Sequence, residues 1–351
     1  MEDIKDLIII GGGQSALACA YFLRRTDVEY LILDNQEQCG GAWLHTWDSL
    51  TLFSPAEYSS LPGWFMPKTE GKFPSREEVI NYLCKYEERY EIPVERPVSV
   101  KKVTKEDDLF VLLTDKGEFR SRAVISATGT WGKPFVPDVP GSDNFNGEQV
   151  HSAHYKNPEN YRGKKVLVVG EGNSGAQLLA ELSKVTLTEW AVREDPDFLP
   201  PDVDGRVLFN VASAKYHAEQ KGEKFDASKY NLGNIVQVPP VKEALERNAL
   251  QSKGSLKEII ANGIVWDTGE KEEFDVIIWC TGFGYATHHL KELVSTDKRG
   301  KIKTEGTRAV ETEGLWLVGY GGCTGYASAT LIGVGRTAKE TVKEVEGFLA
   351  E

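Results

Sequence analysis

Short apolar runs, set apart by polar and glycine-rich segments, recur along the chain and predict the strands of an α/β protein. Two of them, residues 7–10 (Leu-Ile-Ile-Ile) and 166–169 (Val-Leu-Val-Val), lead directly into glycines and then into a segment of helical character. Runs of β-branched and other large apolar residues are typical of buried parallel strands. The pattern therefore predicts two strand–turn–helix units of the same kind.

Further elements follow from the same patterns. A helix is expected over 75–90, with Ser75 as its N-cap and Glu78 completing a capping box. Alternating apolar and polar positions predict a small antiparallel layer. The remaining expected elements are strands over 94–104, 109–113, 123–127, 275–280 and 315–318 and a helix over 327–349.

The order of these elements predicts two domains, one inserted into the other. The apolar runs at 123–127 and 275–280 both end on Thr-Gly, and the whole second unit lies between them. We therefore expect an α/β fold of two Rossmann-like dinucleotide-binding domains, with the chain leaving the first domain and later returning. The expected ranges are 1–150 and 283–351 for the first domain and 151–282 for the second. Residues 195–255 have weak periodicity and too great a length for an ordinary connection, which suggests a lid.

The glycine turns carry the first candidate chemistry. They read Gly11-Gly12-Gly13-Gln14-Ser15-Ala16 and Gly170-Glu171-Gly172-Asn173-Ser174-Gly175. In such a turn the first glycine permits the tight bend, the second lets the backbone approach a pyrophosphate, and the third small residue lets helix and strand pack closely. The open amides at the helix N-terminus then face the phosphates.

The two units differ in charge at the matching downstream position. Asp34 follows the first unit's second apolar run, and Arg193 follows that of the second unit. An acidic side chain there accepts hydrogen bonds from ribose hydroxyls, whereas an arginine can bind a 2′-phosphate. Glu194, next to the arginine, would repel that phosphate or bind a bare ribose. We therefore expect two different dinucleotides, with both NADPH and NADH used at the second site.

Composition narrows the partners. The 351 residues carry a formal net charge of −12 and no basic run, which disfavours nucleic acid and anionic membrane surfaces. No stretch approaches the roughly 18 apolar residues of a membrane span, and the N-terminus lacks the sections of a signal peptide. A cytoplasmic protein is expected.

The five cysteines are scattered, which suits a reducing compartment. No Cys-x-x-Cys or similar close pair is present, so a flavoprotein disulfide reductase is disfavoured.

Other reactive residues predict little chemistry of their own. His151 and His154 lack further ligands at metal-binding spacing, so no metal is expected, and His151 is interpreted as a hydrogen-bonding brace. His288 and His289 are expected at the surface. Ser174 lacks the closing glycine of a nucleophile elbow, which argues against a hydrolase.

Longer motifs resemble a known family. Phe145-x-Gly147-x-x-x-His151-x-x-x-Tyr155, just ahead of the second glycine turn, resembles the signature of class B flavoprotein monooxygenases, in the flavin-containing monooxygenase branch. Gly40-Gly41-Ala42-Trp43 and the two Thr-Gly strand ends also resemble this family. The block from His45 to Trp64 is similar to a small bacterial subgroup that includes flavoproteins of arsenic-resistance operons.

This resemblance implies an FAD that is reduced by a nicotinamide coenzyme and then reacts with oxygen. The resulting flavin C4a-(hydro)peroxide passes one oxygen atom to a soft nucleophile, such as a thioether sulfur or an amine nitrogen, with some Baeyer–Villiger oxidation of small ketones. The implied partners are molecular oxygen and a small nucleophilic substrate. A homodimer is the assembly to expect first, because it is the commonest one among soluble enzymes.

The resemblance also implies site residues by position. The implied FAD contacts are Gly11, Gly13, Gln14, Ser15, Asp34, Asn35, Gly41, Ala42, Trp43, Thr128 and Gly129. The implied nicotinamide dinucleotide contacts are Gly170, Gly172, Asn173, Ser174, Gly175, Arg193 and Glu194.

The chain departs from the family pattern at two places. Related enzymes have an asparagine near the flavin reaction centre where this chain has Phe53-Ser54, so Phe53 is expected to exclude water and Ser54 to donate one hydrogen bond. The subgroup's aspartate in the last glycine-rich turn is replaced by Gly322, so its contact is either missing or made by the backbone. These departures leave open a peroxide-producing NAD(P)H oxidase or flavin reductase. A redox-sensing binding protein is a third alternative, which no feature of the sequence demands.

Overall fold

The computed structural model describes residues 4–223, 234–325 and 327–351. The chain forms two compact units. The first unit comprises Met1–Leu44, Ser54–Lys133 and Phe283–Glu351, and the second comprises His45–Phe53 and Pro134–Gly282. The second dinucleotide-type unit is thus inserted between two parts of the first, as the repeated Thr-Gly endings predict.

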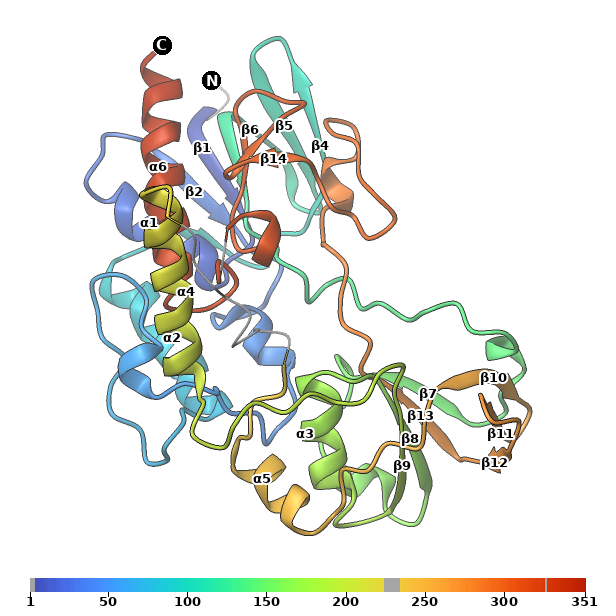
Figure 1. Ribbon diagram of the computed structural model, residues 1–351. Coiled ribbons are helices and arrows are strands. Elements are labelled where there is room, and N and C mark those ends of the chain that lie inside the picture. Colours follow the sequence, from blue (N-terminus) through green and yellow to red (C-terminus); the bar gives the residue numbers. More distant parts are fainter. Residues whose placement is uncertain (1–3, 224–233, 326) are drawn as a thin grey trace. The chain divides into compact units, whose positions relative to one another are not determined.

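The first unit is built on a parallel sheet with the order β16-β6-β1-β2-β3, of which Figure 1 labels β6, β1 and β2. These strands are β1 (Ile4–Ile10), β2 (Tyr30–Leu33), β3 (Val94–Glu95), β6 (Gly117–Ser126) and β16 (Leu315–Leu317). Antiparallel strands extend it: β14 (Thr304–Glu305) and β15 (Arg308–Ala309) beside β16, and β4 (Val100–Glu106) and β5 (Leu109–Thr114) beside β6. Ile8 pairs with Leu31 on one side and Val124 on the other, so β1 lies at the centre.

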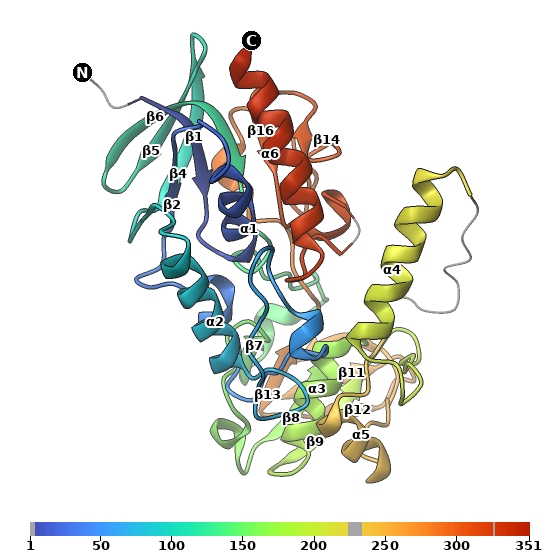
Figure 2. The same ribbon diagram turned by 90° about the vertical axis from the view of Figure 1, so that its left-hand side faces the viewer.

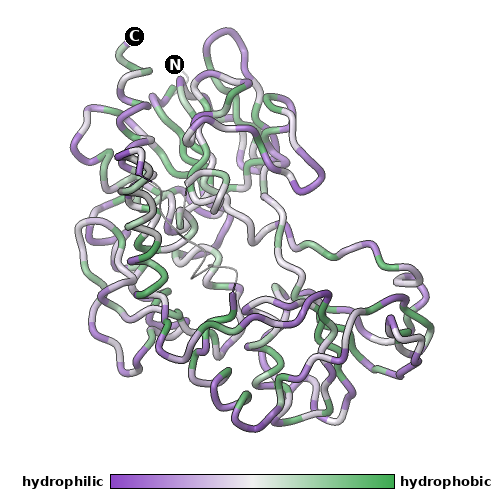
Figure 3. Tube along the Cα trace, viewed as in Figure 1, coloured by the Kyte–Doolittle hydropathy of each residue, from purple (hydrophilic) through white to green (hydrophobic). Residues whose placement is uncertain are grey.

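Helices and an antiparallel layer cover the first unit's sheet. Helix α1 (Gln14–Leu23) packs beside α6 (Val334–Ala350), as Figure 2 shows, and α2 (Arg76–Arg89) contacts α1. The antiparallel layer adds Val103, Phe110 and Leu112 to the same core as Ile8 and Val124. The central strands β1 and β6 carry runs of hydrophobic residues, visible in Figure 3, and their ends are buried.

The second unit has a fully parallel four-stranded sheet in the order β7-β13-β8-β9. Its strands are β7 (Glu148–His151), β8 (Lys165–Val169), β9 (Leu187–Ala191) and β13 (Val276–Trp279). Helix α3 (Asn173–Leu182) contacts β8 and β9 and packs against α5 (Pro239–Glu246). A small antiparallel sheet of β10 (Leu256–Ile260), β11 (Gly263–Trp266) and β12 (Lys271–Glu273) shares a core with β8 and β13.

Most expected elements are confirmed, and three differ in their bounds: the strand expected over 94–104, the strand β6, which begins at Gly117 rather than at 123, and the last helix. The capping box of α2 is present: the Glu78 amide donates to Ser75 Oγ at 3.3 Å, and the Ser75 amide donates to Glu78 Oε2 at 2.8 Å. The expected strand over 94–104 is two strands, because the chain crosses from a parallel pairing with β2 to an antiparallel pairing with β5 around Pro97. The last helix begins at Val334 rather than 327, after a left-handed residue at Ala327 (φ 59°) and turns up to Gly333.

The 195–255 segment, which has weak sequence periodicity, contains two helices, α4 (Gly205–Gln220) and α5. Residues 224–233 of this segment lie outside the described part of the chain, and its role as a lid stays a prediction. The short 3₁₀ helices of the chain are η1 (Gly41–His45), η2 (Ala56–Tyr58), η3 (Ser142–Asn144), η4 (Pro158–Tyr161), η5 (His288–Leu290) and η6 (Gly321–Cys323). None of the helices in the described ranges has the length and apolar character needed to cross a bilayer.

Candidate dinucleotide-binding sites

The first glycine turn is shaped by close backbone approaches that only glycine permits. Gly11 has φ +99°, and a Cβ there would lie 2.9 Å from the carbonyl oxygen of Ala127, at the end of neighbouring β6. Gly41 has φ +56°, and its Cβ would lie 2.7 Å from the Cα of Gly13. Gly13 is the N-cap of α1 and no side chain caps this helix, so its first amides remain available. Glycines from two distant segments thus form one cradle at the carboxyl end of β1.

Several other residues expected to contact FAD lie at the same edge of the sheet. Loops after parallel strands meet at one edge of a sheet, and Asp34, Thr128, Gly129 and Gly322 follow β2, β6 and β16 in this way. Gly322 is exposed in η6, and Asn35 and Ala42 are also exposed, whereas Trp43 is half-buried. The Gln14 side chain donates a 2.7 Å hydrogen bond to the carbonyl of Ala329. Ser15 is buried at the start of α1 and faces Gly319.

Asp34 is held by an arginine that the sequence did not point to. Its carboxylate is 2% exposed and accepts a 2.7 Å hydrogen bond from Arg96 Nε. The other end of the same guanidinium binds both carboxylate oxygens of Glu87 on α2, at 2.6 and 2.8 Å. A Cβ at Gly12 would meet the Asp34 carboxylate, so that carboxylate lies against the glycine turn. Arg96 thus fixes the orientation of the side chain expected to bind ribose.

Thr128 ends a buried chain of hydrogen bonds. It donates to the carbonyl of Ala286 at 2.8 Å, so its oxygen accepts from the Tyr320 hydroxyl at 2.6 Å. The Tyr320 oxygen then accepts from Ser126 at 2.7 Å, and the Ser126 oxygen accepts from Nε2 of His289 at 3.2 Å. This chain holds the Thr128-Gly129 turn in place at the end of β6.

His289 corrects an expectation. The histidine was expected at the surface, but it is 2% exposed, because η5 turns it into the core beside β6. Burial lowers the pKa of His289 to about 3, so the ring is neutral at ordinary pH. Two adjacent histidines in a sequence suggest an exposed polar segment, and only the fold shows that one of them is buried.

The second glycine turn has the same construction. Gly170 has φ +128°, and Gly172 is the uncapped N-cap of α3. A Cβ at Gly175 would collide with the Gly170 carbonyl, which also accepts a 2.9 Å hydrogen bond from Trp190 Nε1. Asn173 Oδ1 accepts from the Val236 amide at 2.9 Å, so its side chain anchors a neighbouring segment, and Ser174 is half-buried beside it.

Arg193 forms an ion pair with the glycine turn itself. Its Nη2 donates to Glu171 Oε1 at 2.7 Å, while its side chain is 85% exposed. Burial would raise the pKa of Glu171, but the hydrogen bond from Arg193, the arginine's positive charge and backbone hydrogen bonds together lower that pKa. Glu194 is exposed next to the arginine. Glu171 could therefore also affect the binding of a 2′-phosphate. The sequence places it at a variable position of the glycine turn, and sequence reasoning did not use that position.

The signature residues His151 and Tyr155 act as braces within the second unit. The Ala153 amide donates to His151 Nδ1 at 3.1 Å, so Nε2 carries the proton and donates to the Gly282 carbonyl at 2.9 Å. Burial lowers the pKa of His151, which keeps this neutral tautomer. Tyr155 donates to Glu181 at 2.5 Å. The expectation that His151 serves as a hydrogen-bonding brace is confirmed.

The candidate catalytic residues Phe53 and Ser54 are half-buried. Phe53 belongs to the second unit, where its carbonyl accepts a 2.7 Å hydrogen bond from the Gly205 amide at the start of α4. Ser54 belongs to the first unit, where its hydroxyl lies 2.9 Å from that of Ser59. Ser59 itself donates to the Pro55 carbonyl at 2.8 Å, so the Ser54 proton points to Ser59. A catalytic role for either residue stays a prediction.

The cysteines require a second correction. Their wide spacing argued against any disulfide able to undergo redox chemistry, but Cys39 and Cys84 form a disulfide with a Cα–Cα distance of 5.2 Å. They are 45 residues apart and meet because α2 packs beside the loop that follows β2. Cys19 and Cys280 are buried free thiols. Among the residues placed by the structure, no group of three or more His, Cys, Asp or Glu side chains could hold a metal ion.

These sites agree with comparisons to known proteins. A family model described as pyridine nucleotide-disulphide oxidoreductase matches residues 8–197, more than half of the chain. The chain therefore belongs to the pyridine nucleotide-disulphide oxidoreductase family, and it is an oxidoreductase.

Individual relatives indicate a narrower class of oxidoreductase than the family model does. The structure of a flavin-containing monooxygenase from Stenotrophomonas maltophilia is 43% identical, with a TM-score of 0.90 and 99% of each chain covered. An oxidoreductase of Bacillus subtilis named CzcO is 33% identical over 97% of this chain and 99% of its own. A probable indole-3-pyruvate monooxygenase of Arabidopsis thaliana, YUCCA4, is 29% identical over 97% of this chain and 88% of its own. The resemblance to flavin-containing monooxygenases is thereby confirmed.

Proposed function

We propose that this protein is a monooxygenase that binds FAD, oxidises NADPH and NADH, and transfers one oxygen atom from O₂ to a soft nucleophile. The observation that carries the proposal is the pair of glycine cradles, each at the carboxyl end of a central parallel strand. Asp34 follows the first cradle and Arg193 the second, so the two sites differ in charge where a ribose or its phosphate would lie. The likeness to a flavin-containing monooxygenase over 99% of the chain supports the same function.

FAD fits the first unit. The approach of Gly41 to Gly13 leaves room for backbone but for no side chain, as a pyrophosphate-binding turn requires. Asp34 would accept hydrogen bonds from the adenosine ribose, oriented by Arg96. The residues that would hold the remaining parts are Gly11, Gln14, Ser15, Asn35, Ala42, Trp43, Thr128, Gly129 and the backbone of Gly322.

The nicotinamide coenzyme fits the second unit. Gly170, Gly172 and Gly175 would carry the pyrophosphate at the start of α3, with Asn173 and Ser174 beside them. Arg193 would bind the 2′-phosphate of NADPH, but it must first leave Glu171. This competition supports use of both coenzymes, because it removes part of the advantage that the arginine gives to NADPH.

The bound flavin would supply the hydride and oxygen chemistry, so the protein needs few acid or base residues of its own. The protein positions the cofactors and excludes water, and we assign this exclusion to Phe53 and a hydrogen-bonding role to Ser54. A thioether sulfur or an amine nitrogen is the substrate class we propose, with small ketones as secondary substrates.

Two measurements test the proposal. The purified protein is expected to be yellow, to release FAD on denaturation, and to oxidise both NADPH and NADH. With a simple thioether such as thioanisole, sulfoxide should form and hydrogen peroxide per NADPH should fall. Colourless protein that stays so after incubation with FAD would refute the proposal. Unchanged peroxide and no sulfoxide would instead identify an NAD(P)H oxidase, which the replacement of the expected asparagine and aspartate keeps open.

A further inference from the structure

The Cys39–Cys84 disulfide connects α2 to the loop between two parts of the candidate FAD site. Cys39 follows Asp34 by five residues and precedes Gly41 by two. Between Asp34 and Gly40 no side chain is buried, so few packing contacts hold this loop. The disulfide is therefore a principal restraint on the loop that runs from Asp34, the carboxylate expected to bind ribose, to Gly41, which lies against Gly13.

A second restraint lies one helical turn further along α2. Glu87 binds Arg96, and Arg96 binds Asp34, so the helix also reaches the site through an ion-pair bridge. This bridge acts on the Asp34 end of the loop. The Gly41 end depends on the disulfide and on Arg76 of α2, which donates a 2.8 Å hydrogen bond to the Leu44 carbonyl in η1. Opening the disulfide would remove one of these two links at the Gly41 end while leaving the Asp34 end attached.

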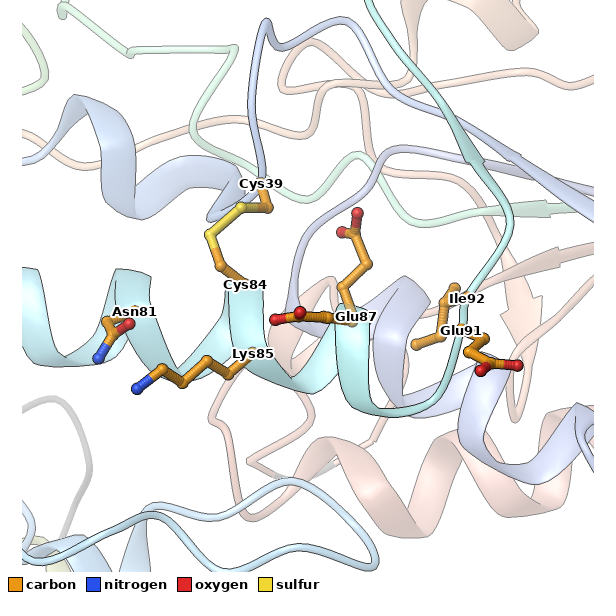
Figure 4. A pocket seen from close by; sticks show the side chains of 8 residues that line it. Cys39, Asn81, Cys84, Lys85, Glu87, Glu91 and Ile92 are labelled. Atoms are coloured by element: carbon orange, nitrogen blue, oxygen red, sulfur yellow. A yellow bond between two sulfur atoms is a disulfide. The ribbon is translucent and has the colours of Figure 1, made fainter.

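The disulfide is accessible to small molecules. Both sulfur-bearing residues are half-buried and line a cavity of about 530 Å³, shown in Figure 4. Lys85, Glu88 and Glu91 line the same cavity and are exposed. A third acid, Glu87, also lines the cavity and shares the Arg96 guanidinium with Asp34, so the cavity lining carries an excess of negative charge. Such a cavity admits neutral and cationic thiols more readily than anionic ones.

We propose that Cys39–Cys84 is a thiol-exchange site, reduced by neutral or cationic thiols, whose opening loosens the hold on FAD. The effect on FAD rests on the proposed function, whereas the exchange itself does not. An external thiolate attacks one sulfur, forms a mixed disulfide with that cysteine and releases the other as a thiolate. A second external thiol then displaces the remaining cysteine and leaves as an external disulfide. Two electrons pass from the two thiols to the protein disulfide, and their protons end on Cys39 and Cys84.

The exchange is tested by alkylation and mass spectrometry of the folded holoprotein. Before thiol is added, Cys39 and Cys84 should be unlabelled while the half-buried Cys323 is labelled. After thiol treatment both should be labelled, with Cys19 and Cys280 still protected as a check that the protein stays folded. Labelling of Cys39 and Cys84 before treatment, or none after it, would overturn the proposal.

Charge selectivity is tested with cysteamine, 2-mercaptoethanol and 2-mercaptoethanesulfonate, with rates compared per thiolate. At low salt the cationic thiol should react at least about twofold faster than the anionic one, and the difference should shrink as salt screens the cavity. Equal rates or the reverse order at low salt would overturn the assigned thiol class.

The effect on the cofactor is tested by the rate of FAD release, followed by flavin fluorescence. Reduced and alkylated protein should release FAD at least about threefold faster than the oxidised form, since weaker binding appears mainly in dissociation rates. The Cys39→Ala/Cys84→Ala variant should release it as fast as the reduced form and should not respond to thiol. Equal release from both forms, or a variant that still responds to thiol, would overturn the proposal. If no form binds FAD, the proposed function fails, while the alkylation experiment still decides the exchange.

Discussion

Replacement of Glu171 by glutamine should shift coenzyme choice toward NADPH. In the structure Arg193 Nη2 lies 2.7 Å from Glu171 Oε1, so the arginine must break this ion pair before it can bind a 2′-phosphate. The pair is solvent-exposed on the arginine side, and exposed pairs contribute about 0.2–1 kcal/mol. Removing the competition should therefore raise kcat/KM for NADPH relative to NADH by about 1.4-fold to fivefold.

A double-mutant cycle separates this mechanism from simple repulsion of the phosphate. Arg193→Ala alone should lower kcat/KM for NADPH by about tenfold to a hundredfold, the range for a charged hydrogen bond. If Glu171 acts by holding the arginine, Glu171→Gln should have no effect in the Arg193→Ala background. If it acts by direct repulsion, its effect should persist there.

The steady-state assay needs a matched control. Glu159 and Arg162 form another exposed ion pair in the same unit, at 2.7 Å, remote in sequence from the glycine turn. Glu159→Gln should leave the NADPH to NADH ratio unchanged. The reasoning is wrong if Glu171→Gln leaves the ratio unchanged, or if it raises the ratio equally with and without Arg193.

Three further perturbations test the first unit. Burial holds the pKa of His289 at about 3 in the folded protein, below the ordinary 6.5. As the pH falls below 6.5, the unfolded protein therefore binds a proton that the folded protein does not, and the folded state loses stability. His289→Asn should reduce the fall in unfolding free energy between pH 7.5 and 5.5 by about 1.4 kcal/mol, measured by urea titration. Arg96→Gln leaves the buried Asp34 carboxylate unpaired and should lower stability by about 3 kcal/mol and weaken FAD binding in a fluorescence titration, with Arg96→Lys intermediate. Gly41→Ala combines a left-handed backbone with a 2.7 Å clash and should lower the midpoint of thermal unfolding and the FAD content; unchanged values would contradict the cradle.

The elements that sequence reasoning predicted well are those whose signals are local. The two glycine turns, the capping box of α2 and the Thr-Gly strand ends each occupy a few adjacent residues. Their geometry is decided by neighbours in the chain, because a tight turn or a helix cap is completed within one or two turns of backbone. The longer expectations failed at the point where pairing partners changed, as around Pro97, or where a helix began late, as at Val334.

The interactions that sequence reasoning missed join residues that are distant along the chain. Arg96 and Asp34 are 62 residues apart, Cys39 and Cys84 are 45 apart, and Arg193 and Glu171 are 22 apart. Single residues of these types are common on any surface, so nothing in the sequence marks one as the partner of another. The burial of His289 belongs to the same class, because the ring lies beside Ser126 at the end of β6, 163 residues away along the chain.

These missed contacts share a physical role, which explains why a motif search does not reveal them. A glycine cradle requires positions without side chains, so it can be recognised in a sequence from its glycines. In the proposed function, the strength and selectivity of binding would depend on groups that orient the cradle's surroundings: Arg96 on Asp34, the disulfide on the loop before Gly41, and Glu171 on Arg193. Any residue that the fold brings within reach can supply such a group, so two proteins with identical glycine motifs can still differ in cofactor retention and coenzyme choice.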